Sequence, residues 1–227
     1  MIESLFDSLT EEQQGLIMKH LALVIETNKT LNLTRIDTVE SGMLLHIEDS
    51  LSALPEISAV KEGPYIDLGS GGGYPGIPLA IATKRQTVLL DARQKKAEAL
   101  TTMIGELGLS DQITAEHDRI EHYALTHKNR YSLVTARALA KLSVLLEFAS
   151  PLLSMGGSLV CYKAQIDEDE YSHAQKVEKQ TGMRIISRRN FVLSDDETKR
   201  CIVVAIKERK PSVSLPRHDG YAQKKPL

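Results

Sequence analysis

The stretch YIDLGSGGGYPGIPLAI, which occupies residues 65–81, decides the fold of this chain. Its apolar start is typical of a buried strand, and Asp67 then opens a turn dense in glycine. Pro75 and Pro78 close the turn, and proline is tolerated in the first turn of a helix because the N–H there has no partner. The order is therefore strand, tight turn and helix. In an open α/β sheet, ligands bind at such a junction, and glycine lets the backbone approach them closely.

The spacing of the glycines excludes two phosphate-binding motifs. G-x-G-x-x-G counted from Gly69 requires a glycine where Tyr74 stands, and a P-loop ends in Gly-Lys-Ser/Thr. The pattern D-x-G-x-G-x-G over residues 67–73 resembles the first motif of Rossmann-like S-adenosylmethionine-dependent methyltransferases, in which the turn makes room for the methionine part of the cofactor. The alternative is a turn that only packs a strand on a helix, but five glycines within residues 69–76 exceed what such a turn requires.

The composition is that of an ordinary soluble protein, with 42% of 227 residues hydrophobic and 26% charged. The net charge of -2 conceals an asymmetry, because residues 207–227 carry six Lys or Arg and two acids, hence +4, and the remainder carries -6. A basic tail on an acidic body can contact phosphates, or it can simply be solvated. The sequence has neither a signal-peptide pattern nor a run of eighteen apolar residues, so we expect a cytoplasmic protein without membrane contact.

No metal site or reactive thiol is predicted. His46 and Asp49 lie three residues apart on an expected helix and share a face, but two ligands are too few for a metal. A hydrogen bond between them, beside a pocket or in the core, is the favoured interpretation. Cys161 and Cys201 each lie inside an apolar run and are expected to be buried, inert thiols.

Periodicity extends the pattern to the rest of the chain. A capping box at Thr10 to Gln13 predicts a helix to about Thr27, a second helix is expected over 37–54, and 55–63 reads as a linker. Further helices are expected over 93–107 and 142–153, and further strands over 87–91, 113–115, 131–135, 158–163, 184–192 and 201–207. The last two strands are joined by a polar loop with no room for a helix, so they should be antiparallel. The sequence therefore predicts an α/β protein of the Rossmann-like class I methyltransferase type, with a seven-stranded, mostly parallel sheet, an antiparallel last strand and preceding N-terminal helices.

Polar side chains are expected at the carboxyl ends of these strands. Asp91 ends the second strand, where an acid can accept hydrogen bonds from ribose hydroxyls or cap the next helix. Ile120 and Glu121 follow the third strand, where an adenine would lie, and Arg137 leaves the fourth strand toward the same crevice. Basic residues in the first turns of the helix over 93–107 oppose its dipole, which suggests substrate phosphates, although a solvated face is the commoner explanation.

A closer resemblance covers nearly the whole chain. Its segments, in order, are Asn32-Leu33-Thr34, His46 to Leu51, Asp67 to Ile81 with the specific Pro-Gly-Ile-Pro extension, Leu90-Asp91, Lys95-Lys96, Arg137 to Ala140, and Pro216 to Leu227. These segments are similar to those of the bacterial RsmG (GidB) family, the guanine-N(7)-methyltransferases of small-subunit (16S) ribosomal RNA. The resemblance implies S-adenosyl-L-methionine as cofactor and 16S ribosomal RNA as partner.

The resemblance and the chemistry together imply site residues. The expected cofactor-binding residues are Asp67, Gly69, Gly71, Gly73, Tyr74, Asp91, Ile120, Glu121 and Arg137. The expected substrate-binding residues are Asn32, Arg35, His46, Lys95, Lys96, Lys163, Arg217, Lys224 and Lys225. Arg137 would position the reactants. Ring nitrogen 7 of guanine carries a lone pair and no proton, so methyl transfer to it needs no general base and depends on alignment and electrostatics.

The expected organisation is an N-terminal helical extension over 1–62, a methyltransferase core over 63–208 and a basic tail over 209–227, in a monomer. Nitrogen 7 faces the deep groove of an A-form helix, which side chains cannot read, so the substrate guanine should lie in a loop or an opened segment, within the small subunit or an assembly intermediate. Two alternatives remain open: a methyltransferase of a small molecule or protein, which would not need the tail, and a non-catalytic ribosome-binding module, which would bind RNA without turning over cofactor.

Overall fold

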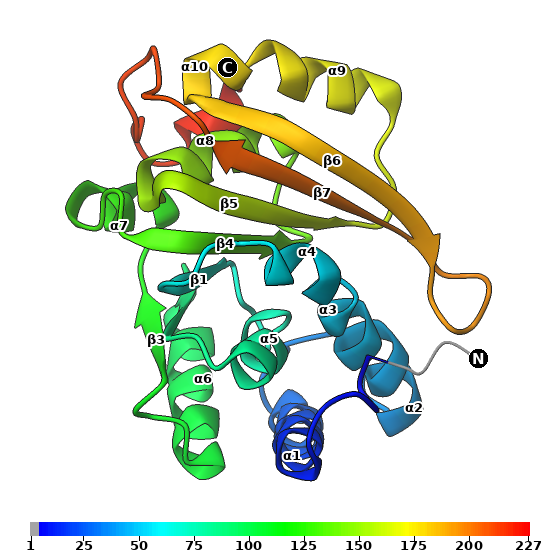
Figure 1. Ribbon diagram of the computed structural model, residues 1–227. Helices are drawn as coiled ribbons and strands as arrows, with labels where there is room; N and C mark the ends of the chain where they lie inside the picture. Colours follow the sequence, from blue (N-terminus) through cyan, green and yellow to red (C-terminus); the bar gives the residue numbers. More distant parts are fainter. Residues whose placement is uncertain (1–4) are drawn as a thin grey trace.

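The computed structural model describes residues 5–227, so the first four residues of the expected N-terminal extension lie outside it. One seven-stranded sheet runs through the molecule in the order β3-β2-β1-β4-β5-β7-β6 (Figure 1). The strands are β1 (Tyr65–Leu68), β2 (Thr87–Asp91), β3 (Ile113–His117), β4 (Tyr131–Arg137), β5 (Leu153–Lys163), β6 (Met183–Val192) and β7 (Lys199–Lys207). All pairs are parallel except those that β7 makes with β5 and β6, which confirms the predicted fold class.

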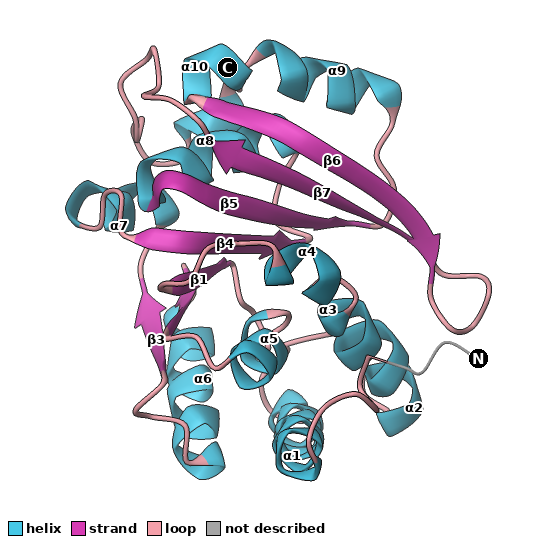
Figure 2. Cartoon of the chain, viewed as in Figure 1, coloured by secondary structure: helices cyan, strands magenta, loops and turns pink. Residues whose placement is uncertain are grey.

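Helices cover both faces of the sheet (Figure 2). One layer consists of α1 (Glu11–Asn28), α5 (Gly76–Thr83), α6 (Gln94–Leu107) and a helical segment made of α2 (Val39–Gly42), the π-helix η1 (Met43–Glu48), α3 (Asp49–Leu51) and α4 (Leu54–Ser58). The other layer consists of α7 (Ile120–Thr126), α8 (Leu142–Leu152), α9 (Glu168–Lys176), α10 (Glu178–Thr181) and α11 (Tyr221–Lys224). Because both faces are covered, the central strand β1 is buried along its whole length, as expected of parallel strands.

The first helix forms as its sequence predicts. Thr10 caps α1, and its side chain and that of Gln13 satisfy each other's backbone N–H groups in a capping box. The helix expected over 37–54 is also present, but it contains the π-helical stretch η1.

Several details differ from the prediction, among them the short helices α7, α10 and α11, which were not predicted. Residues 55–63 are not only a linker, because Pro55 occupies the first turn of α4, where its missing N–H costs nothing, and Ile57 is buried. The charged helix α9 was not predicted, since only Ala174 in it is buried and its apolar periodicity is weak. β5 begins at Leu153 instead of Ser158, with a register shift opposite Tyr131 and Leu133.

Both cysteines are free and buried, as expected, and burial raises the pKa of the Cys161 thiol to about 12. In the described part of the chain, none of the helices has the length and apolar character needed to span a bilayer.

Candidate cofactor and RNA site

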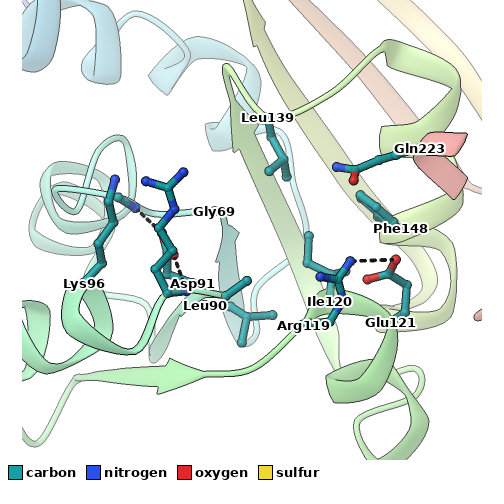
Figure 3. A pocket seen from close by; sticks show the side chains of 13 residues that line it. Gly69, Leu90, Asp91, Lys96, Arg119, Ile120, Glu121, Leu139, Phe148 and Gln223 are labelled. Carbon is teal, nitrogen blue, oxygen red and sulfur yellow. Dashed lines mark hydrogen bonds and ion pairs between the residues drawn. The ribbon is translucent and has the colours of Figure 1, made fainter. Parts of the chain in front are cut away.

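A cavity of about 340 Å³ opens at the carboxyl ends of β1 and β2, at the edge that the glycine turn predicts (Figure 3). Its volume is within the range of about 300–1,000 Å³ that is typical of small-molecule sites. The residues around it are Gly69, Gly71, Leu90, Asp91, Ala92, Arg93, Lys96, Arg119, Ile120, Glu121, Leu139, Phe148 and Gln223. Five of the residues expected to bind cofactor therefore lie together: Gly69, Gly71, Asp91, Ile120 and Glu121.

The glycine turn brings the backbone to the cavity without side chains in the way. Gly69 and Gly71 have φ values of +70° and +59°, a region that glycine adopts without steric cost. A Cβ on Gly69 would lie 2.8 Å from the Leu139 side chain, whereas a Cβ on Gly71 would meet no atom nearer than 3.9 Å. The space beside Gly71 is therefore open for a ligand.

Asp91 fixes the other wall of the cavity. One carboxylate oxygen accepts a hydrogen bond from the Gly71 N–H at 2.9 Å, and the other accepts one from the Arg93 N–H at 2.9 Å. Each oxygen of a carboxylate has two lone pairs, so both retain one acceptor position. Asp91 thus holds the turn and can still accept hydrogen bonds from a pair of hydroxyls.

At the far side of the cavity, the start of α7 supplies Ile120 and Glu121. Ile120 is part of the cavity wall. The buried carboxylate of Glu121 accepts a hydrogen bond at 2.6 Å from the N–H of Gly220, in the C-terminal tail, and lies 3.9 Å from the Arg119 guanidinium. Glu121 is therefore already engaged by the protein.

Asp67 and Gly73 lie behind the turn and do not line the cavity. Asp67 is buried, accepts a hydrogen bond from the Thr135 hydroxyl at 2.5 Å, and has its pKa raised to about 6 by burial. A Cβ on Gly73 would come within 2.7 Å of Ile77 and 2.9 Å of the His20 ring, so glycine here lets α1 and α5 pack against the turn. Both residues support the turn from below.

The Tyr74 side chain also points away from the cavity. Its ring stacks on His46, with centroids 4.1 Å apart, and lies 4.5 Å from the His20 ring. Burial lowers the pKa of His20 to about 4, and burial together with the nearby Arg137 charge lowers that of His46 to about 3. Both imidazoles are therefore neutral near pH 7. The His46 side chain, expected to contact substrate, is instead 5% exposed and hydrogen-bonds Thr34 at 3.1 Å.

Arg137 stands at the end of β4, beside the glycine turn, and the N-terminal helices hold it. Its guanidinium donates to the carboxylate of Asp49 at 3.0 Å, to the Leu45 carbonyl at 3.1 Å and to His46 Nδ1 at 3.3 Å. Asp49 is buried and also accepts a hydrogen bond from Arg200 at 2.9 Å. Arg137 is therefore fixed in orientation, with 15% of its side chain exposed at the carboxyl edge of the sheet.

The expected substrate residues divide into two groups. Asn32, Arg35, Lys95, Lys224 and Lys225 are exposed. By contrast, Lys96 lines the cavity and its ammonium lies 3.4 Å from the Leu33 carbonyl. Lys163 pairs with Glu170 at 2.7 Å, and Arg217 forms two hydrogen bonds with buried Glu147, at 2.6 and 2.5 Å.

Residues 13–198 match the GidB family, described as rRNA small subunit methyltransferase G. The chain belongs to this family. A protein named ribosomal RNA small subunit methyltransferase G from Alkaliphilus metalliredigens is 31% identical over 222 residues, which cover 96% of this chain and 92% of that protein. The protein of the same name from Ligilactobacillus salivarius is 33% identical over 226 residues, which cover 97% and 93%.

The fold has solved counterparts. Geranyl diphosphate C-methyltransferase from Streptomyces coelicolor A3(2), in complex with S-adenosyl-L-homocysteine, superposes with a TM-score of 0.53 at 11% identity, over 70% of this chain and 80% of that chain. Membership in the GidB family confirms the enzyme class and the cofactor predicted from the sequence: the protein is an S-adenosylmethionine-dependent methyltransferase of 16S ribosomal RNA.

Several residues around the cavity of this GidB chain were not expected to bind cofactor: Leu90, Ala92, Arg93, Arg119, Leu139, Phe148 and Gln223. Leu90 and Leu139 belong to segments that carry the family resemblance, so their place beside the turn has a sequence signal. Gln223 also lies in such a segment, Pro216 to Leu227, but its place at the cavity depends on how the tail folds. Phe148 has no sequence signal, because only the folding of α8 brings it to the cavity. Within residues 5–227 there is no cluster of three or more potential metal ligands.

Proposed function

We propose that the cavity beside the glycine turn binds S-adenosylmethionine and that the protein methylates ring nitrogen 7 of a guanine in 16S ribosomal RNA. The observation that supports this most is the meeting of Gly71, Asp91 and Ile120 around one cavity at the carboxyl edge of β1 and β2. At one end of the cavity the glycine backbone is bare, in the middle the Asp91 carboxylate can accept hydrogen bonds from hydroxyl groups, and at the other end the wall is apolar.

The residues present fit this cofactor. The ribose hydroxyls would donate to the two acceptor positions left on Asp91, and the adenine would lie against Ile120 and Phe148. The methionine part would follow the backbone of Gly69 and Gly71, where a side chain would intrude. When bound, the sulfonium supplies an electrophilic methyl group, and the protein's own residues have only to bind and orient.

No base is needed, and the groups near the cavity agree with that. Asp91 and Glu121 both accept hydrogen bonds from backbone N–H groups, which hold them in place as acceptors. His20 and His46 are neutral, buried and turned away from the cavity. Arg137 has its guanidinium fixed beside the turn, where it can orient the acceptor base by hydrogen bonds.

We place the RNA on the exposed cations at this edge. Asn32 and Arg35 lie in the turn after α1, and Lys96, which lines the cavity, donates a hydrogen bond to the Leu33 carbonyl of this turn. Lys224 and Lys225 are exposed on the tail. The RNA would present the guanine from a loop or opened segment of the small subunit or an assembly intermediate. We expect the protein to act as a monomer, in the cytoplasm where ribosomes assemble, with residues 1–62 orienting Arg137 and residues 209–227 offering cations.

The experiment is to incubate the protein with methyl-labelled cofactor and small ribosomal particles and to locate the label. Guanine methylated at nitrogen 7 carries a fixed positive charge, so borohydride reduction followed by aniline should cleave the RNA at the labelled position. Label without cleavage would contradict nitrogen 7 as the acceptor. Label in a protein or a metabolite would remove the RNA assignment, and RNA binding without any label would leave only the non-catalytic module.

A further inference from the structure

The C-terminal residues 215–227, here called the strap, are packed against the core. Leu215 and Ala222 are buried, and Ala222 belongs to the main core together with residues of α8. The strap includes the short helix α11, which places Gln223 at the mouth of the cofactor cavity, facing Phe148 and Leu139 (Figure 3).

Two buried carboxylates hold the strap in this position. Glu147 on α8 is 3% exposed and accepts two hydrogen bonds from the Arg217 guanidinium, which makes a third to the Lys225 carbonyl at 2.9 Å. Glu121 on α7 is 5% exposed and accepts from the Gly220 N–H. A buried carboxylate is costly unless it is paired, and both find their partners in the strap.

A third contact, an ion pair, also joins the strap to the core. Arg119, which lines the cavity, lies 3.3 Å from the carboxylate of Asp219 in the strap. The strap is thus held to the core at Arg217, Asp219 and Gly220. These ties leave little freedom for the position of α11.

Gln223 is the strap residue at the cavity, and its amide is suited to an adenine. The side chains of Ile120, Leu139 and Phe148 around the cavity are apolar, so they can pack on the faces of a base but offer it no hydrogen bonds. Glu121 already accepts from the strap. An amide has both a donor NH₂ and an acceptor carbonyl, which matches the amino group and the adjacent ring nitrogen of adenine.

We propose that the strap completes the cofactor site and that Gln223 recognises the edge of the adenine, with Glu121 and Glu147 as positioning residues that fix the strap. This rests on the proposed assignment of the cavity to the cofactor. It also accounts for the buried carboxylates of Glu121 and Glu147, which find their partners in the strap.

The experiment compares two ligands and three proteins. S-Adenosylhomocysteine and its analogue without the 6-amino group of the purine are titrated calorimetrically into the full wild-type chain, Gln223→Ala and Gln175→Ala. Gln175 is an exposed glutamine on α9, away from the cavity, and is the matched control. We expect wild type and Gln175→Ala to bind the analogue about 10-fold more weakly than the parent ligand, which corresponds to one hydrogen bond. Gln223→Ala should bind both ligands equally, and the parent about 10-fold more weakly than wild type does.

A second measurement tests the strap itself. Glu147→Gln keeps the shape of the side chain but removes the charge that holds Arg217, so we expect faster tryptic cleavage after Arg217 and partial loss of discrimination between the two ligands. Full discrimination by Gln223→Ala, or none by wild type, would overturn the role of Gln223. Unchanged cleavage and discrimination in Glu147→Gln would overturn the positioning role. A wild-type chain that binds neither ligand would remove the proposed cofactor site and this inference with it.

Discussion

At the scale of single residues, Gly71 is the position where the backbone must stay bare for the cofactor. Its φ is positive and a Cβ there would point into open space, so Gly71→Val should fold but fill part of the cavity. Gly108→Val is the matched control, because Gly108 has a φ of +70°, nothing within 4 Å of its Cβ position, and lies at the far end of α6. Both variants should lose about 1–2 kcal/mol of stability.

Only Gly71→Val should lose cofactor affinity, because its branched side chain would exclude the methionine part of the cofactor. We expect a loss of about 100-fold or more, which corresponds to about 3 kcal/mol of binding free energy. Calorimetry with S-adenosylmethionine checks this. Equal affinities for the two variants would place the cofactor elsewhere.

The lowered pKa of His46 predicts how the stability of the fold depends on pH. Its pKa falls from 6.5 to about 3 in the folded state, so as the pH drops below 6.5 the unfolded chain gains a proton that the folded chain does not. Stability is therefore lost as the pH falls, by about 2 kcal/mol at pH 5 from this residue alone. His20, with a pKa of about 4, adds a similar loss, and Asp67, whose raised pKa makes it take up a proton in the folded state first, opposes both.

The test isolates His46 by comparison. In urea unfolding at pH 7 and pH 5, His46→Gln should show a pH-dependent loss smaller than wild type's by about 2 kcal/mol, because His20 and Asp67 are common to both proteins. An identical loss in the two proteins would mean that His46 is protonated in the folded state.

At the scale of elements, the helices before the sheet position a residue of the sheet. Arg137 makes three hydrogen bonds to η1 and α3, and a lysine cannot reproduce this arrangement. Arg137→Lys should therefore lower the turnover number at least about 10-fold, since alignment is lost. Cofactor affinity should stay within about 3-fold, because Arg137 does not line the cavity.

Arg200→Lys is the matched control. Arg200 donates a hydrogen bond to the same Asp49 carboxylate, but it lies on β7, away from the glycine turn. Its turnover should be close to that of wild type. An equal loss of turnover in both variants would mean that the ion pairs of Asp49 with Arg137 and Arg200 only stabilise the fold.

The elements also show what the sequence can and cannot predict. The strand, turn and helix around residues 65–81, the alternation that follows, and the antiparallel β6 and β7 were all predicted, because their apolar runs and glycine signals are local. The helices α9 and α10 were missed because they bury few residues, and α4 because Pro55 reads as a break. The direction of the Tyr74 side chain could not be predicted, since it depends on His20 and His46 from distant helices.

At the scale of the whole molecule, the cations on the strap form part of a surface that includes the cavity mouth. Arg217 is paired with Glu147, so Lys224 and Lys225 are the tail cations left for phosphates at this edge. Replacing both lysines by alanine should weaken RNA binding and reduce the log–log salt slope by about 1.5 units, at about 0.7–0.9 per lost contact. Lys84→Ala with Lys128→Ala, two exposed lysines that precede β2 and β4 at the opposite edge, should leave the slope unchanged.

The measurement is RNA affinity over a range of salt concentrations, with calorimetry to show that S-adenosylmethionine still binds. If the strap variant keeps the wild-type slope, the tail lysines are solvated and the RNA lies elsewhere.

The reaction as a whole should be insensitive to pH around neutrality. Of the described groups with shifted pKa values, His20, His46 and Asp67 titrate at about pH 6 or below and do not line the cavity. Lys207, with a pKa lowered to about 8 by burial, donates to the carbonyls of Ser150 and Leu153, at the opposite edge of the sheet.

An acceptor nitrogen with a lone pair and no proton requires no base. Turnover with saturating RNA and cofactor should therefore vary less than about 2-fold between about pH 6.5 and 8.5, whereas an amine acceptor, which must lose a proton, would give a rise of about 10-fold per pH unit below its pKa. Single-turnover rates across this range decide between the two, and a steep rise would exclude nitrogen 7 of guanine.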